Sequence, residues 1–271
     1  MKLKRKFVAK PWGQDKLPQP FAGDRSSRIG EIWFEPPTGV TPQLMVKYLF
    51  TSDKLSIQVH PNDRQARRQG FPHGKEECWY ILDAEPDAKL GIGLTKSVST
   101  TKLHAAVACG QMENLIDWRP VQPGDVFYVP AGTIHAIGPG ITLVEIQQNV
   151  DVTYRLYDYG RPRELHLEEA IEVATPAPYD LKHQSRAEAD QSAKLIDGPQ
   201  FRLFQVIGDD PDIFHQIQAS EWHVVPLEGK VTVRGKLIAS GECGLCTRSS
   251  EIDLKKNVRS LVACTMKPGG K

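Results

Sequence analysis

The stretch from Gly124 to His135 limits the possible folds of this chain most strongly, because it specifies a strand, a tight turn and the start of a second strand. Val126–Val129 are β-branched or aromatic, which favours a strand. Pro130–Gly132 then reverses the chain, since proline fixes one backbone angle and glycine accepts a left-handed conformation. Another strand is predicted to begin at Leu143. His135 is therefore expected just past a turn, at the mouth of a small β-barrel.

Two strands are predicted upstream, and both carry polar groups on one face. Residues 55–60 alternate apolar and polar side chains, which places Gln58 and His60 on the same face, about 7 Å apart along the strand. Residues 75–82 form the next predicted strand, with Lys75 and Glu77 on one of its faces. We expect these groups to point into the barrel together with His135.

The composition is that of an ordinary globular protein of 271 residues, enough for one large domain or two small ones. A net charge of +1 favours neither a nucleic-acid nor an anionic-membrane partner. Five scattered cysteines predict reduced thiols in a cytoplasmic protein. The basic start of the chain is followed by no apolar run, so we expect neither a signal peptide nor a membrane span.

The pattern predicts a mainly β protein with a few short helices, at 100–108, 111–118 and 165–173. We predict a first domain at 1–174, which carries the chemistry, and a linker at 175–200, where periodicity fades. Residues 201–271 resume the strand alternation and are predicted to form a smaller β-barrel without metal ligands. The lone pair Cys243 and Cys246 and the remaining histidines show no ligand pattern, so we expect them to be structural.

Four ordered segments of the chain resemble the type I mannose-6-phosphate isomerases, most closely their short bacterial branch. The segments are Leu55–Asp63, Gly74–Leu82, Pro130–Ile137 and Glu145–Tyr159. These isomerases are zinc-dependent cupins, and the spacing G-x5-P-x-G-x-x-H that ends at His135 is similar to the second metal motif of that superfamily. The resemblance covers residues 7–173 well and implies tandem cupin-like (jelly-roll) β-barrels.

The resemblance also implies a metal centre in the first barrel. It matches four residues to the ligands of one zinc ion per chain: Gln58, His60, Glu77 and His135. Two imidazoles, a carboxylate and an amide oxygen form a donor set that suits zinc, and iron or manganese would also fit it.

The implied reaction interconverts mannose 6-phosphate and fructose 6-phosphate by moving a proton through a cis-enediol. Such a reaction needs a base and a group that stabilises the developing oxyanion. Arg155 matches the catalytic arginine and Lys75 a lysine of the substrate pocket; both are expected to stabilise the oxyanion or to hold the phosphate. Glu145 is the first candidate for the base and Glu31 the second.

Trp12 and Ser56 match further positions of the substrate pocket, so the expected partner is a small sugar phosphate. The segment 33–51 is shorter than the corresponding segment is in most of the family, and it is expected near that pocket. Another sugar or sugar phosphate therefore stays possible as the substrate. Two further functions stay open: a non-catalytic, metal-holding sugar-binding cupin and an iron dioxygenase. Arg155, Lys75 and Glu145 argue against the former. Gln58 as a ligand and the isomerase-like segment Glu145–Tyr159 argue against the latter. The sequence specifies no oligomeric state.

Overall fold

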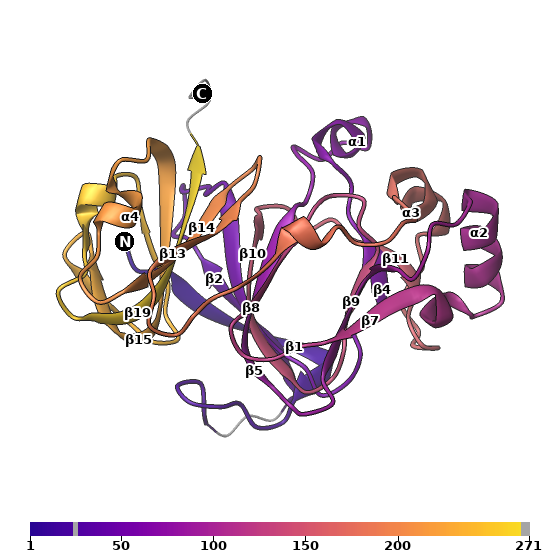
Figure 1. The fold of residues 1–271 in the computed structure, drawn as a ribbon, viewed down its shortest axis with the longest axis horizontal. Coiled ribbons are helices and arrows are strands. Elements are labelled where there is room, and N and C mark those ends of the chain that lie inside the picture. The colour runs from indigo at the N-terminus through magenta and orange to yellow at the C-terminus, as the bar shows by residue number, and fades with distance from the viewer. Residues whose placement is uncertain (24–26, 267–271) are drawn as a thin grey trace.

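The computed structural model describes residues 1–23 and 27–266, which form three antiparallel β-sheets with short helices around them (Figure 1). Strands account for 45% of the residues and helices for 14%, so the predicted mainly β fold is confirmed. Among the residues described, we find no helix with the length and apolar character that a membrane crossing requires.

Two facing sheets enclose the first barrel. From edge to edge, the first sheet contains β1 (Lys4–Gln14), β2 (Ile29–Glu35), β3 (Leu44–Phe50), β10 (Ile141–Gln148), β5 (Glu77–Ala84), β8 (Asp125–Val129) and β12 (Gln184–Arg186). The second sheet contains β11 (Tyr154–Tyr157), β4 (Ile57–Val59), β9 (His135–Ile137), β6 (Lys89–Leu94) and β7 (Ile116–Pro120).

The third sheet builds the C-terminal half. It contains β13 (Ala193–Asp197), β14 (Arg202–Ile207), β19 (Asn257–Met266), β15 (Ala219–Val233) and β16 (Lys236–Ala239), and both β17 (Gly244–Cys246) and β18 (Ile252–Asp253) pair with β15. The α-helices are α1 (Asp63–Arg68), α2 (Thr100–Ala108), α3 (Leu167–Val173) and α4 (Asp212–His215). Short 3-10 helices occupy Met112–Leu115, Leu181–His183 and Ser249–Glu251.

The helix predictions are confirmed at α2 and, within two residues of its start, at α3. The predicted helix at 111–118 is wrong: a single 3-10 turn is followed by strand β7. In this strand Ile116 and Trp118 pair with residues of β6, so tertiary pairing outweighs the local helical pattern. Helices α2 and α3 lie together outside the second sheet, at one end of the molecule (Figure 1).

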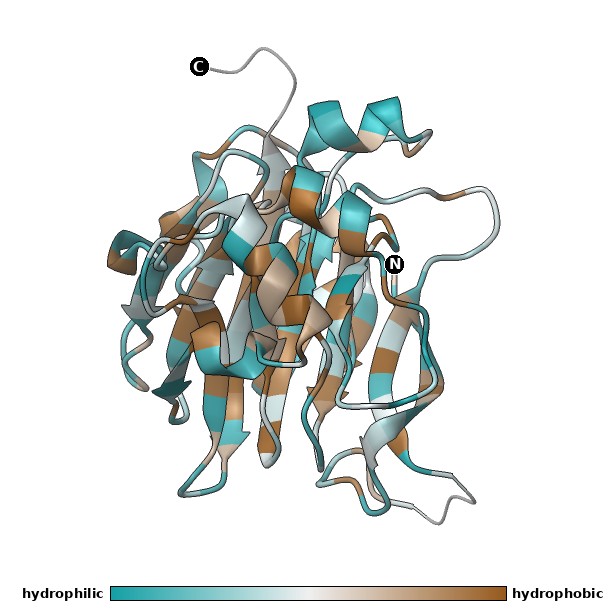
Figure 2. Ribbon diagram, turned by 90° about the vertical axis from the view of Figure 1, so that its right-hand side faces the viewer, coloured by the Kyte–Doolittle hydropathy of each residue, from teal (hydrophilic) through white to brown (hydrophobic). Residues whose placement is uncertain are grey.

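The central strands of the first sheet, such as β3, β10 and β8, are buried on both faces. In β3, Val46 and Tyr48 pack into the apolar core shared with the C-terminal half, whereas Leu49 packs inside the first barrel. Successive side chains of a strand point to opposite faces, so a sheet covered on both sides reads as an almost continuous apolar run. The alternating bands of hydropathy along other strands are visible in Figure 2. Polar side chains at inward positions of this sheet are therefore the exceptions, and they mark the site.

The predicted division of the chain at 175–200 remains a prediction. Within that range β12 pairs with β8 of the first sheet, and β13 pairs with β14 of the third. The core between the halves includes Tyr48 from the first sheet and Leu245 from the third. Residues 267–271, the end of the predicted second barrel, lie outside the described residues.

Candidate active site

Three buried side chains meet inside the first barrel: His60, Glu77 and His135. One ligand atom from each lies within 4.8 Å of the others. His60 follows β4, Glu77 begins β5 and His135 begins β9, so strands of both facing sheets bring the donors together. The Nε2 atoms of His60 and His135 lie 3.5 and 3.4 Å from the two carboxylate oxygens of Glu77.

These donors fit a metal ion. Both carboxylate oxygens of Glu77 are buried, and apart from the ion pair of Oε2 with Lys75 neither has a hydrogen-bond partner. His135 Nδ1 lies 2.9 Å from the carbonyl oxygen of Thr133, and donating its proton there leaves the Nε2 lone pair free to bind a metal. Burial lowers the pKa of both imidazoles, which keeps them neutral and able to act as ligands near neutral pH.

Lys75 places a positive charge among the same donors. Its Nζ atom lies 2.9 Å from Glu77 Oε2 and 3.2 Å from His60 Nε2, and the side chain is buried. Burial of an ammonium group is unfavourable unless nearby groups compensate for the lost hydration. The position of Lys75 therefore shows that this cluster favours a cation.

Gln58 is the fourth predicted ligand, and it lies beside the cluster. Its Cα is paired with that of His135 across β4 and β9, and its Nε2 lies 3.3 Å from His135 Nε2. Rotation of the amide by about 180° would present its oxygen to the cluster instead. The structure thus brings together all four residues predicted as ligands, and their role as ligands stays a prediction.

A polar cavity of about 120 Å³ opens next to the donor cluster. Gln58 and Lys75 line it and also contact the histidines, so the donor cluster lies directly behind this part of the cavity wall. The other predicted site residues that line the same cavity are Trp12, Glu31, Ser56, Glu145 and Arg155. Predicted site residues that are far apart in the chain, from Trp12 to Arg155, therefore line one cavity.

Glu145 is buried in the cavity wall and is held by two donors. Lys47 Nζ lies 3.1 Å from its Oε1, and Trp79 Nε1 donates to its Oε2 at 3.3 Å. Burial alone would raise the pKa of Glu145, but the charges of Lys47 and Lys75 outweigh burial and lower it. Glu145 is therefore ionised at neutral pH and able to accept a proton. Glu31, the other candidate base, accepts from Trp33 Nε1 at 2.6 Å and lies 3.3 Å from Lys10 Nζ.

Arg155 differs from the other cations of the cavity. Within residues 1–23 and 27–266 we find no carboxylate paired with it, and its Nε is buried without a partner. Burial and then the charge of Arg163 lower its pKa. Arg163 also lines the cavity, but Asp158 binds it through two hydrogen bonds of 2.6 Å. The free guanidinium of Arg155 is suited to an anionic group of a ligand.

Sequence reasoning missed four charged residues of the cavity: Lys10, Lys47, Asp151 and Arg163. Lys47 interrupts the otherwise apolar run of β3, and a buried lysine in such a strand is a signal that could have been recognised. For Arg163 we find no local signal, because its place depends on how the loop after β11 folds back onto Asp158.

Comparisons with known proteins agree with this geometry. No protein-family model matches the chain. The chain is 46% identical over 152 residues to mannose-6-phosphate isomerase ManA of Bacillus subtilis, which covers 52% of the chain and 48% of that relative. It is 37% identical over 200 residues to the probable mannose-6-phosphate isomerase GmuF of the same organism, covering 69% of the chain and 62% of GmuF. The crystal structure of the mannose 6-phosphate isomerase from Bacillus subtilis superimposes with a TM-score of 0.76 at 25% identity, covering 97% of this chain and 98% of that one.

The chain is similar in sequence and in fold to the mannose-6-phosphate isomerases. The resemblance read from its four ordered segments is thereby confirmed. In sequence, the matched region spans about half to three fifths of the length of these two curated relatives.

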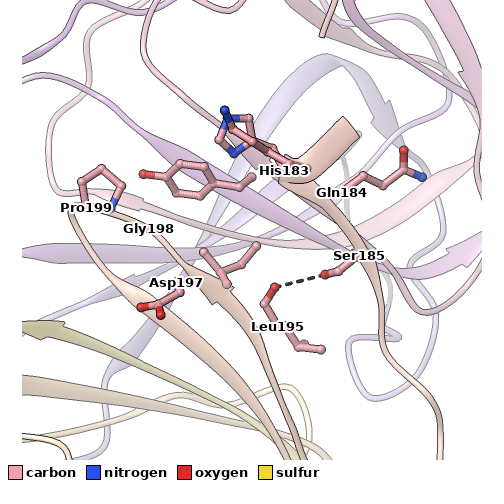
Figure 3. A pocket seen from close by; sticks show the side chains of 10 residues that line it. His183, Gln184, Ser185, Leu195, Asp197, Gly198 and Pro199 are labelled. Atoms are coloured by element: carbon pink, nitrogen blue, oxygen red, sulfur yellow. Dashed lines mark hydrogen bonds between the residues drawn. The ribbon is translucent and has the colours of Figure 1, made fainter. Parts of the chain in front are cut away.

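The structure contains a second cavity, of about 210 Å³. Tyr128 and the segments around His183 and Asp197 line it, and Ser185 Oγ donates to the carbonyl oxygen of Leu195 at 3.1 Å across it (Figure 3). None of the residues predicted for the active site lines this cavity. The chemistry is therefore assigned to the first cavity.

Asp158 is expected to hold the loop that carries Arg163. The change Asp158→Asn leaves Arg163 without its bidentate partner, so we expect the free energy of unfolding to fall by about 2–3 kcal/mol. Urea denaturation measures this change. The matched control is Asp180→Asn, whose exposed pair with Lys182 should leave the denaturation midpoint unchanged. Equal shifts in both variants would contradict the structural role of Asp158.

Proposed function

We propose that this protein is a zinc-dependent isomerase that interconverts mannose 6-phosphate and fructose 6-phosphate. The observation that carries the proposal is the arrangement around one cavity: buried side chains that could bind a metal lie directly behind Gln58 and Lys75 of its wall, and the unpaired guanidinium of Arg155 lies in the same wall. A metal-dependent isomerase of an anionic sugar needs both features. The relatives that bear the isomerase name support the same reaction.

His60, Glu77 and His135 would hold the zinc ion, with Gln58 as a fourth ligand. When bound, zinc supplies a Lewis acid that polarises the substrate oxygens at C1 and C2. Two imidazoles and one carboxylate would provide the donor set that is usual in catalytic zinc sites.

The side chains around these donors can carry out the proton transfers. The ionised carboxylate of Glu145 takes the proton from C2 of the aldose, which gives a cis-enediol, and returns it to C1 to give the ketose. The hydroxyl proton at O2 moves to O1 in the same conversion, so the atoms balance. The ammonium group of Lys47 lies beside Glu145 and that of Lys75 beside His60. Both can stabilise negative charge on O1 and O2 of the substrate.

A panel of sugars tests this function on the zinc-loaded protein. We expect the highest kcat/KM with mannose 6-phosphate and a value about 100-fold lower with free mannose, which lacks the anionic group for Arg155. A higher value with another sugar phosphate would move the substrate assignment to that sugar. Absence of turnover with every sugar, despite bound zinc, would leave a sugar-binding cupin.

The change Arg155→Ala separates two roles for this guanidinium. If Arg155 holds the phosphate, kcat/KM for mannose 6-phosphate should fall about 10- to 100-fold, while the slow turnover of free mannose stays unchanged. If Arg155 acts at the reacting oxygens, kcat/KM should fall by the same factor for mannose 6-phosphate and for free mannose. The control is Arg202→Ala, because Arg202 pairs with Asp197 away from the cavity.

A further inference from the structure

A single carboxylate of the C-terminal half holds the start of strand β3. Glu221, on β15, accepts the backbone N–H of Gln43 at 3.0 Å and 2.9 Å through its two oxygens. It also accepts the N–H of Leu44 at 3.2 Å. The Glu221 side chain is almost completely buried, so water cannot replace these bonds at low cost.

Buried partners fix the orientation of this carboxylate. His223 Nε2 lies 2.8 Å from Glu221 Oε1, and the other ring nitrogen lies 3.9 Å from Cys243 Sγ. This Cys-His-Glu series is no nucleophilic site, because Cys243 is fully buried and burial raises the pKa of its thiol. Its effect is to keep Glu221 aimed at the backbone of β3.

Strand β3 connects this contact with the candidate active site. Lys47 stands three positions after Leu44 on the same strand and bonds to Glu145 in the cavity. The carbonyl oxygen of Gln43 accepts from the backbone N–H of Asn149, just after β10, at 2.9 Å. The first residues of β3 are thus held from one side by β10 and from the other by Glu221.

We propose that Glu221 is a positioning residue, through which the C-terminal half sets the place of Lys47 against Glu145. The inference rests on the proposed isomerase function, because Lys47 and Glu145 act there on the reacting atoms. An ionised acceptor forms stronger hydrogen bonds to backbone N–H groups than a neutral one. Loss of that charge loosens the end of β3 while β4, β5 and β9, which carry the metal donors, remain in place.

The test is Glu221→Gln in the full-length, zinc-loaded protein. The amide has one acceptor oxygen in place of two and adds donors next to two N–H groups. We expect kcat for mannose 6-phosphate to fall about tenfold, with KM changed less than about twofold and one zinc still bound per chain. Hydrogen exchange should become faster in residues 43–49 and stay unchanged in the metal-bearing strands.

A matched control separates this effect from general loosening of the C-terminal half. Glu242 lies in that half, accepts the N–H of Ala239 at 2.9 Å and pairs with Lys2, and among the described residues it forms no hydrogen bond or ion pair with β3. Glu242→Gln should leave kcat unchanged. An equal fall of kcat in both variants, or unchanged exchange of residues 43–49 in folded Glu221→Gln, would overturn the proposal.

The wild-type protein provides a second measurement in case Glu221→Gln fails to fold. The amides of Gln43 and Leu44 should exchange as slowly as those in the centre of β15, since release of Glu221 requires the halves to separate. Much faster exchange at Gln43 and Leu44 would overturn the proposal. If the wild type shows the slow exchange but isomerises no sugar, the proposed function fails and the structural contact through Glu221 stands.

Discussion

The change Glu77→Ala is expected to remove the bound metal and to lower the turnover of mannose 6-phosphate about 10³-fold or more. Glu77 is the carboxylate between His60 and His135, and its one other charged partner among the described residues is Lys75. A metal ion contributes several kcal/mol to stabilising charge in a transition state of this type, which corresponds to at least about three orders of magnitude in rate.

Metal analysis of the purified variant, together with an isomerase assay, measures both effects. The matched control is Glu76→Ala, which removes the neighbouring carboxylate. Glu76 accepts from Tyr128 and points away from the donor cluster, so this variant should keep its metal and most of its activity. Chelation of the wild type should reproduce the loss, and added zinc should reverse it. Full activity of metal-free Glu77→Ala would rule out a metal-dependent mechanism.

The change Glu145→Gln is expected to lower kcat about 10²- to 10⁴-fold while zinc remains bound, because the amide cannot accept the C2 proton. The side chain keeps its shape, and the metal donors stand on other strands. Exchange of the C2 proton with deuterated solvent measures the same step directly and should fall in parallel. Since neighbouring lysines lower the pKa of Glu145, the wild-type rate should not vary with its ionisation near neutral pH.

Glu31→Gln is the matched comparison for this experiment. Glu31 lines the same cavity, but Trp33 and Lys10 already occupy its Oε2. C2 exchange at the wild-type rate in Glu145→Gln would remove Glu145 as the base. A large loss in Glu31→Gln would then assign the role to Glu31.

The donor cluster could be predicted from local sequence because each donor stands in a strongly patterned segment. Gln58 and His60 are separated by one residue in an alternating strand, so they share a face whichever strand lies beside them. The turn Pro130–Gly132 fixes where the strand of His135 begins. The convergence of these strands on one ion was supplied by the family resemblance, and the structure places the side chains accordingly.

Other features depended on contacts between distant segments, which no local pattern encodes. The bond between Lys47 and Glu145 follows from the register of β3 against β10. Residues 111–118 have a helical pattern, yet pairing with β6 turns their second half into a strand. The contact of Glu221 with the start of β3 joins residues 178 positions apart, and neither partner carries a motif.

The first sheet separates the polar cavity on one of its faces from the apolar core on the other. Along β3 and β10, Lys47 and Glu145 face the cavity, while their neighbours Tyr48 and Val144 face the apolar core. Because side chains alternate with a period of two, one inserted or deleted residue would turn the cavity-facing side chains that follow it toward the apolar core, and the core side chains toward the cavity. Changes of length in this protein should therefore be tolerated in the loops and should disrupt folding within these strands.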